Sequence, residues 1–168
     1  VAIENPKALK RFFEALRRSA EQEPGATVRV AHYGDSSVAA DEITQTVRRK
    51  MQLRFGDAGH GFMLMAKGDM HYVHRDVSHG ESDGWDLSSI VRRGLKSGFY
   101  GYGGVLARAW GGETASFGTV TRGPIGTFVS RFEVFFQRFP NGGDLKLTVD
   151  NGAPKTVRTR SDTTEDGW

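Results

Sequence analysis

The chain has 168 residues, of which 38% are hydrophobic, 26% are charged and none is cysteine, and its formal net charge is +3. This length suits one ordinary domain or one domain with part of another, and the balanced composition excludes a disordered chain. No run of about 18 apolar residues occurs, which excludes a membrane-spanning helix. The lack of cysteine excludes disulfides, a thiol nucleophile and cysteine-ligated zinc, and the small charge gives no indication of the dense basic face of a nucleic-acid-binding protein.

The first predicted element is a helix from Pro6 to Glu21. Asn5 is a candidate N-cap, and proline suits the first helical position. Apolar residues recur at three- and four-residue spacing, which is typical of an amphipathic helix. They are Leu9, Phe12, Phe13, Leu16 and Ala20.

The next elements are a strand, a sharp turn and a second helix. The β-branched run from Thr27 to Tyr33 predicts the strand, which stops at Gly34-Asp35-Ser36. A helix is predicted from Ala40 to Arg54, with Gly56 as its C-terminal stop. This order is typical of the start of an α/β domain. The apolar face of the second helix is predicted from Ile43, Val47 and Met51.

From Gly56 onward glycines are frequent and strand-like alternation replaces helical spacing. A further strand is possible at Phe62–Met65. The clearest β pattern covers residues 127–159, where an alternating strand leads through Asn141-Gly142-Gly143 to a returning strand. The turn Asp150-Asn151-Gly152 and residues 155–160 follow. This pattern predicts an antiparallel meander of the kind that builds a β-sandwich.

Ser36 is the strongest candidate for a catalytic residue. A serine on the turn after a buried strand lies at the carboxyl edge of the sheet, where open α/β sheets place their sites. The unpaired amides at the start of the following helix can stabilise an oxyanion, but a serine needs a base to become a nucleophile. The alternative is an ordinary Asx-type turn at a helix N-cap.

The segment around Ser36 resembles the first block of the SGNH/GDSL hydrolase superfamily. The resemblance rests on Gly34-Asp35-Ser36-Ser37 after the predicted strand and on the stretch from Arg54 to Phe62, RFGDAGHGF. Over residues 27–62 the chain is similar to envelope proteins of the peptidoglycan O-acetylesterase type. In those proteins a β-sandwich that resembles a carbohydrate-binding module is inserted after the nucleophile segment.

The resemblance implies the fold and the role of Ser36. Residues 1–65 would begin an SGNH domain of the flavodoxin-like three-layer α/β class, and residues 66–168 would form the inserted antiparallel β-sandwich, with the chain incomplete. Ser36 would be the nucleophile and its backbone N–H an oxyanion donor, with Gly34 and Asp35 supporting the turn. The substrate would be O-acetylated carbohydrate of the cell envelope, in the periplasm or outside the cell, and no cofactor is required.

Three further blocks of the family lack a clear counterpart here. No Gly-x-Asn-Asp sequence occurs. The resemblance therefore places the Asp and His of the triad beyond Trp168, in a second chain or a C-terminal fragment that completes the hydrolase domain. Asp-x-x-His does occur early, at Asp57–His60 and Asp76–His79, where chance matches in polar turns are the alternative.

Three other groups of side chains bear on ligand binding. His71, His74 and His79 lie near Asp69 and Asp76, but their spacing matches no closed zinc motif, and we predict no metal site. Arg48-Arg49-Lys50 is interpreted as a solvated helix face in preference to a phosphate site. The aromatic residues Trp85, Tyr100, Tyr102 and Trp110 are candidates for stacking on a sugar ring, with packing in the sandwich as the alternative.

Two functions therefore remain open at the level of the sequence. The first is the N-terminal portion of a serine esterase that acts on acylated carbohydrate. The second is a non-catalytic module that binds carbohydrate or protein, with the Gly-Asp-Ser turn as scaffold. A nucleic-acid-binding module is less well supported, because clustered cations interleaved with aromatic residues are missing.

Overall fold

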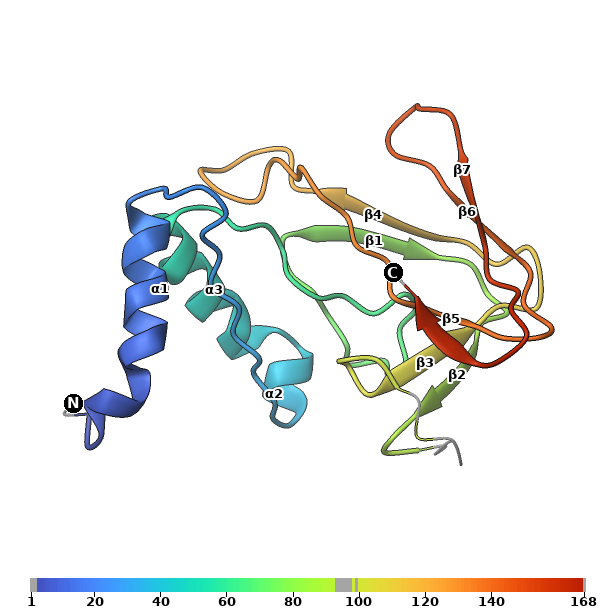
Figure 1. The fold of residues 1–168 in the computed structure, drawn as a ribbon, viewed down its shortest axis with the longest axis horizontal. Helices are drawn as coiled ribbons and strands as arrows, with labels where there is room; N and C mark the ends of the chain where they lie inside the picture. Colours follow the sequence, from blue (N-terminus) through green and yellow to red (C-terminus); the bar gives the residue numbers. More distant parts are fainter. Residues whose placement is uncertain (1–2, 93–97, 99, 168) are drawn as a thin grey trace. The chain divides into compact units, whose positions relative to one another are not determined.

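The computed structural model describes residues 3–92, 98 and 100–167. The chain divides into two compact units, each drawn in Figure 1. The first comprises Val1–Ala109 and Glu113–Val129, and the second comprises Trp110–Gly112 and Ser130–Trp168. These units do not divide at the boundary near residue 65 that the resemblance implies, so that domain division stays a prediction.

The helix expected from Pro6 to Glu21 is confirmed. It consists of a 3-10 turn, η1 (Pro6–Leu9), and the helix α1 (Lys10–Ala20). Asn5 occupies the N-cap position, although its side chain makes no capping hydrogen bond. Leu16 is the buried residue of α1.

The second expected helix is also confirmed, and a short helix precedes it. α2 covers Ser36–Ala39 and α3 covers Glu42–Phe55, with Gly56 as the C-cap of α3. α1 and α3 lie side by side (Figure 1), and the hydroxyl of Ser19 donates a hydrogen bond of 2.9 Å to the carbonyl oxygen of Phe55. The carboxyl ends of the two helices are therefore held together.

Of the three residues that mark the predicted apolar face of α3, Met51 is half-buried and the other two are exposed. Ile43 and Val47 are 51% and 45% exposed. The covered side of α3 includes polar side chains, because the amide of Gln52 and the guanidinium of Arg48 donate to the backbone carbonyls of Gly59 and Arg75. Hydrogen-bonding partners on the facing loops thus decide which side of α3 is covered.

The segments expected as strands at Thr27–Tyr33 and Phe62–Met65 contain no strand in the structure. A strand exists only where a neighbouring strand accepts its backbone hydrogen bonds. In the described part of the chain no segment pairs with either of them, and Val30 and Tyr33 are 65% and 75% exposed. The three-layer α/β fold therefore stays a prediction.

The strands of the first unit form two antiparallel pairs. β1 (Val77–Glu81) pairs with β4 (Ala115–Thr119), and β2 (Asp86–Ser89) pairs with β3 (Val105–Arg108). In the first pair His79 lies opposite Phe117, and their rings stack with centroids 4.8 Å apart.

The strands of the second unit also form two antiparallel pairs. β5 (Phe136–Arg138) pairs with β8 (Glu165–Gly167), and β6 (Asp144–Leu147) pairs with β7 (Lys155–Arg158). The expected turn Asp150-Asn151-Gly152 joins the paired strands β6 and β7. The strand expected from residue 127 is formed only at its end.

The expected meander differs in its pairing. β5 pairs with β8 and not with its neighbour in sequence, β6, so Asn141-Gly142-Gly143 does not join two paired strands. The reason is the contact between Phe139 and the segment after β7, where the Phe139 amide donates to Thr159 and its carbonyl accepts from Ser161. The β-sandwich stays a prediction.

Apolar burial is sparse. Of the described residues, three apolar ones are buried, namely Leu16, Leu64 and Ala66, and all three belong to the first unit. Within the described ranges, no helix combines the length and apolar character needed to cross a bilayer.

Candidate active site

The turn that carries Ser36 is held by its own neighbours. The Asp35 carboxylate accepts a 3.0 Å hydrogen bond from the Ser37 amide, and Asp35 is the N-cap of α2. Its carbonyl oxygen accepts from the amides of Val38 and Ala39 at 3.1 Å. A Cβ atom on Gly34 would lie only 2.6 Å from Cγ2 of Val38, so any other residue here would force Val38 to shift. The expected Gly-Asp-Ser turn before a helix is thus present, without the strand.

Ser36 itself is exposed at the first position of α2. Its carbonyl oxygen accepts a hydrogen bond from the Ala40 amide at 2.8 Å. Among the described residues, neither its amide nor its hydroxyl has a hydrogen-bond partner, so no imidazole hydrogen-bonds to it. The side chain is accessible to a substrate, and its activation needs a base from elsewhere.

The carboxyl end of α2 is fixed by the loop at residues 73–75. The Val73 amide donates a 2.9 Å hydrogen bond to the carbonyl oxygen of Ala39. Two residues later, Asp41 is only 4% exposed and adopts a left-handed backbone conformation with a φ of 55°. Its Oδ2 atom accepts a 2.8 Å hydrogen bond from the Arg75 amide.

Asp41, the N-cap residue of α3, also forms an ion pair with Arg48 of that helix. The guanidinium of Arg48 donates to both of its carboxylate oxygens, at 3.0 and 2.7 Å, and the Thr44 hydroxyl donates to Oδ1. Burial on its own would raise the pKa of Asp41, but the hydrogen bonds from Arg48, Thr44 and Arg75 outweigh it and hold the pKa below its ordinary value of 3.8. Asp41 is therefore a buried carboxylate.

The sequence analysis overlooked Asp41. The available indication was the spacing of Thr44 and Arg48, three and seven residues later, which places both on the side of α3 that faces its first turn. The interpretation of Arg48-Arg49-Lys50 as a solvated face is wrong for Arg48, whose side chain is 18% exposed. Arg49 is half-exposed and pairs with Asp76.

The early Asp–His pairs form no dyad. The Asp57 carboxylate accepts from the amides of Gly59 and Gly126, at 2.9 and 2.7 Å, and so connects two loops. His60 is buried, and its Nε2 atom has no partner in the described part of the chain. The Asp57 carboxylate makes no hydrogen bond to His60.

The second pair is divided between two environments. Asp76 binds Arg49 and Gln45 on α3. Burial alone would raise the pKa of Asp76, but the Arg49 and Gln45 hydrogen bonds lower it overall. His79 instead lies with Nε2 at 3.2 Å from the carbonyl oxygen of Met65 and 3.6 Å from the Glu81 carboxylate.

The histidines considered for metal binding do not converge. Asp69 accepts a hydrogen bond from the His71 amide and pairs with Arg92. The ring of His74 lies between the carbonyl oxygens of His60 and Arg75, at 2.9 and 3.2 Å. Burial lowers the pKa of His74, and the positive charge of Arg48 lowers it further. In residues 3–92, 98 and 100–167, no three ligating side chains group together.

The candidate sugar-stacking residues belong to both units. In the first unit, Trp85 is half-buried and its Nε1 donates to the carbonyl oxygen of Thr114 at 3.3 Å. Tyr102 is 68% exposed, and its ring forms a T-shaped pair with that of Phe62, with centroids 5.9 Å apart. Tyr100 is half-buried, and Trp110, which is exposed, belongs to the second unit.

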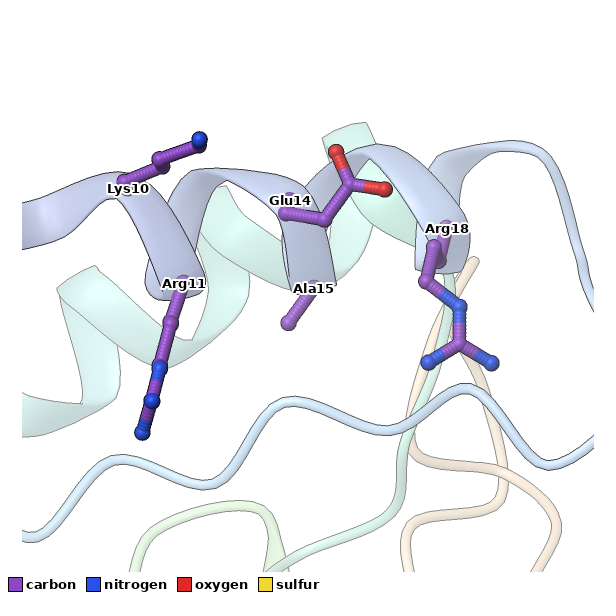
Figure 2. Close-up of a pocket in the computed structure, with 5 residues that line it drawn as sticks. All are labelled: Lys10, Arg11, Glu14, Ala15 and Arg18. Carbon is purple, nitrogen blue, oxygen red and sulfur yellow. The ribbon is translucent and has the colours of Figure 1, made fainter.

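A shallow hollow lies on α1 and is lined by charged side chains (Figure 2). Lys10, Arg11 and Glu14 line it with Ala15 and Arg18. The Nε atom of Arg18 donates to Glu23 at 2.7 Å. All five residues come from one helix face, and Ser36 is not among them, so the hollow adds nothing to the site.

No family model matches the chain, and no curated protein or solved structure is significantly similar to it. Membership of the SGNH superfamily therefore stays a prediction that rests on residues 27–62. The exposed Ser36 on its fixed turn remains the feature with the clearest chemical use.

Proposed function

We propose that this chain is the N-terminal portion of a serine esterase of SGNH type, which hydrolyses or transfers O-acyl groups, in particular O-acetyl groups, on envelope carbohydrate. The observation that supports the proposal is the exposed Ser36 on a turn held by the Asp35 carboxylate and by the close contact of Gly34 with Val38. The envelope location, periplasmic or secreted, comes from the resemblance alone.

In this proposal the Ser36 Oγ attacks the carbonyl carbon of the ester. A new Oγ–C bond forms, the Ser36 N–H donates to the oxyanion, and a histidine takes the hydroxyl proton. The bond from the acyl carbon to the sugar oxygen then breaks, and the histidine returns the proton to that oxygen. Water, or a second sugar hydroxyl, attacks the acyl-enzyme and releases Ser36. No cofactor takes part.

The proposal takes the histidine and aspartate of the triad from polypeptide beyond Trp168, either a second chain or a C-terminal fragment. Exposed side chains before α2 and on α3 are available for contact with such a partner. Tyr33, Ile43 and Val47 are all between 45% and 75% exposed, and burying apolar surface is the main driving force for association. We expect these three side chains to become buried when the complete hydrolase domain is formed.

The test is labelling of the intact protein, meaning this chain together with the polypeptide that supplies the triad histidine and aspartate. The label is a fluorophosphonate, which reacts with an activated serine by forming an O–P bond and expelling fluoride. We expect a single labelled peptide that contains Ser36. Ser36→Ala should abolish both the label and the hydrolysis of O-acetylated glycan. Ser37→Ala is the matched control and should retain both. Folded, intact protein that takes up no label at Ser36 would overturn the proposal.

The alternative function is a non-catalytic module that binds carbohydrate. It is favoured by the exposed Tyr102, which rests on Phe62, and by Trp110, which is 72% exposed, because aromatic faces stack on sugar rings. The test is sedimentation of the intact protein with insoluble peptidoglycan. Binding that is lost in Tyr102→Ala or Trp110→Ala, with Ser36 unlabelled, would favour the module over the esterase.

A further inference from the structure

The short helix that begins at Ser36 depends on its flanks. α2 has only four residues, and an isolated helix of this length is not stable in water. At its amino end, Asp35 and the contact of Gly34 with Val38 hold the turn. What holds its carboxyl end therefore also decides where Ser36 points.

The carboxyl end is held by one backbone hydrogen bond and by Asp41. The bond joins Ala39 to Val73. Asp41 reverses the chain between α2 and α3 in a left-handed conformation, which costs free energy for a residue other than glycine. Its carboxylate compensates by binding both Arg48 on α3 and the backbone amide of Arg75. The buried side chain thus joins α3 to the loop at residues 73–75, and the backbone amide of the same residue donates a 3.1 Å hydrogen bond to the carbonyl oxygen of Val38 on α2.

We infer that Asp41 is a positioning residue for Ser36. This inference rests on the proposed function, since it assigns Asp41 a role in the reactivity of the same serine. Asp41 fixes the carboxyl end of α2 against α3 and the loop, and α2 in turn fixes the direction of the Ser36 hydroxyl. Catalysis is sensitive to such positioning, because a displacement of about 1 Å can cost about 100-fold in rate.

Asp76 provides a matched control within the same unit. It also has a left-handed backbone, with a φ of 67°, and its carboxylate also binds α3, through Arg49 and Gln45. Its Oδ2 atom also lies 4.0 Å from the Arg48 guanidinium, but among the described residues its carboxylate makes no hydrogen bond to α2 or to Asp41. Asparagine tolerates the left-handed conformation well, so Asp41→Asn and Asp76→Asn each remove one charge without a new backbone conflict.

The experiment compares the two variants in the intact protein. We expect Asp41→Asn to lower the rate of fluorophosphonate labelling at Ser36, and kcat for ester hydrolysis, by about 10- to 100-fold. KM should stay within about twofold, because Asp41 is buried away from substrate. Amide exchange at residues 36–40 should become faster. Asp76→Asn should leave the labelling rate, kcat and this exchange close to those of the wild type.

The outcomes separate this inference from the proposed function. Wild-type labelling and exchange in Asp41→Asn would overturn the inference, as would an equal effect of Asp76→Asn. If the wild type takes up no label, the proposed function fails and the exchange at residues 36–40 alone decides whether Asp41 holds the turn. If Asp41→Asn does not fold, Thr44→Val replaces it, because this variant removes one hydrogen bond to Asp41. Thr44→Val should lower the labelling rate, whereas Asp76→Asn should not. A wild-type labelling rate in Thr44→Val would overturn the inference.

Discussion

Asp41 and Arg48, seven residues apart, form a two-point ion pair in which both carboxylate oxygens accept from the same guanidinium. The pair is shielded from water, with side-chain exposures of 5% for Asp41 and 18% for Arg48. Arg49, the next residue, forms its pair with Asp76 while half-exposed. Two adjacent arginines of α3 therefore both pair with aspartates, and the two pairs differ in their exposure to solvent.

This difference predicts unequal effects of two adjacent substitutions. Arg48→Ala leaves the Asp41 charge buried without its cation, which should lower the free energy of unfolding by about 3 kcal/mol. Arg49→Ala removes a more exposed pair and should cost less than about 1 kcal/mol. Urea unfolding of the two variants and the wild type measures both values. Equal losses would contradict the assignment of Arg48 as the buried partner.

His74 should titrate below the ordinary imidazole pKa of 6.5. Burial and the Arg48 charge lower its pKa, and they outweigh the carbonyl oxygens of Arg75 and His60, which favour the protonated ring. An NMR titration of its ring, assigned with His74→Gln, checks the direction. A midpoint at or above 6.5 would contradict it.

The lowered pKa of His74 also sets the sign of a pH effect on stability. The unfolded chain binds this proton more readily than the folded one, so stability falls as the pH drops below about 6.5 and levels off below the folded pKa. Each unit of lowering corresponds to about 1.4 kcal/mol. Unfolding at pH 7 and pH 5 should show a smaller difference in His74→Gln than in the wild type.

Gly34 and Val38 should behave as a coupled pair. An alanine Cβ at residue 34 would lie 2.6 Å from Val38 Cγ2, and a β-branched side chain has few rotamers with which to yield. Gly34→Ala should therefore destabilise the protein by about 1–3 kcal/mol. Val38→Ala removes the obstructing methyl groups, so the double variant should match Val38→Ala alone. Thermal unfolding of the three variants tests this, and additive losses would argue against the contact.

The adjacent glycines 142 and 143 should differ sharply. A Cβ on Gly142 would overlap the carbonyl oxygen of Thr159, which is backbone and cannot rotate away, whereas a Cβ on Gly143 meets no atom within 4 Å. Gly142→Ala should cost at least about 2 kcal/mol and expose the amides of β6 and β7 to exchange. Gly143→Ala is the matched control and should be close to neutral. Similar amide exchange in the two variants would contradict the close approach of Gly142 to the backbone of Thr159.

Helix prediction succeeded because it depends on neighbours in sequence. The spacing of Leu9, Phe12 and Leu16 and the stop at Gly56 are sufficient to locate α1 and the end of α3. Strand prediction failed at Thr27–Tyr33 because a β-branched run supplies only one of the two segments that a β-ladder needs. The other half must come from a segment elsewhere, and the described part of the chain provides none for it.

The candidate site shows the same division. Ser36, Asp35 and Gly34 could be identified from the sequence because the capping and the close approach of Val38 involve residues at most four positions apart. The importance of Asp41 could not, since its burial requires the Arg75 amide, 34 residues away.

The sequence by itself determined the two helices, the Gly-Asp-Ser turn before α2 and the hairpin turn at Asp150–Gly152, all of which follow from local backbone preferences and capping. Only the tertiary structure decided that Arg48 of α3 is covered while Ile43 and Val47 are exposed, that β5 pairs with β8, and that neither Asp–His pair forms a dyad. Each of these features depends on hydrogen bonds between segments that are distant in sequence. Several pairings of such segments are compatible with the same local sequence pattern. The pairing that forms is the one that gives the backbone and charged groups their hydrogen-bond partners.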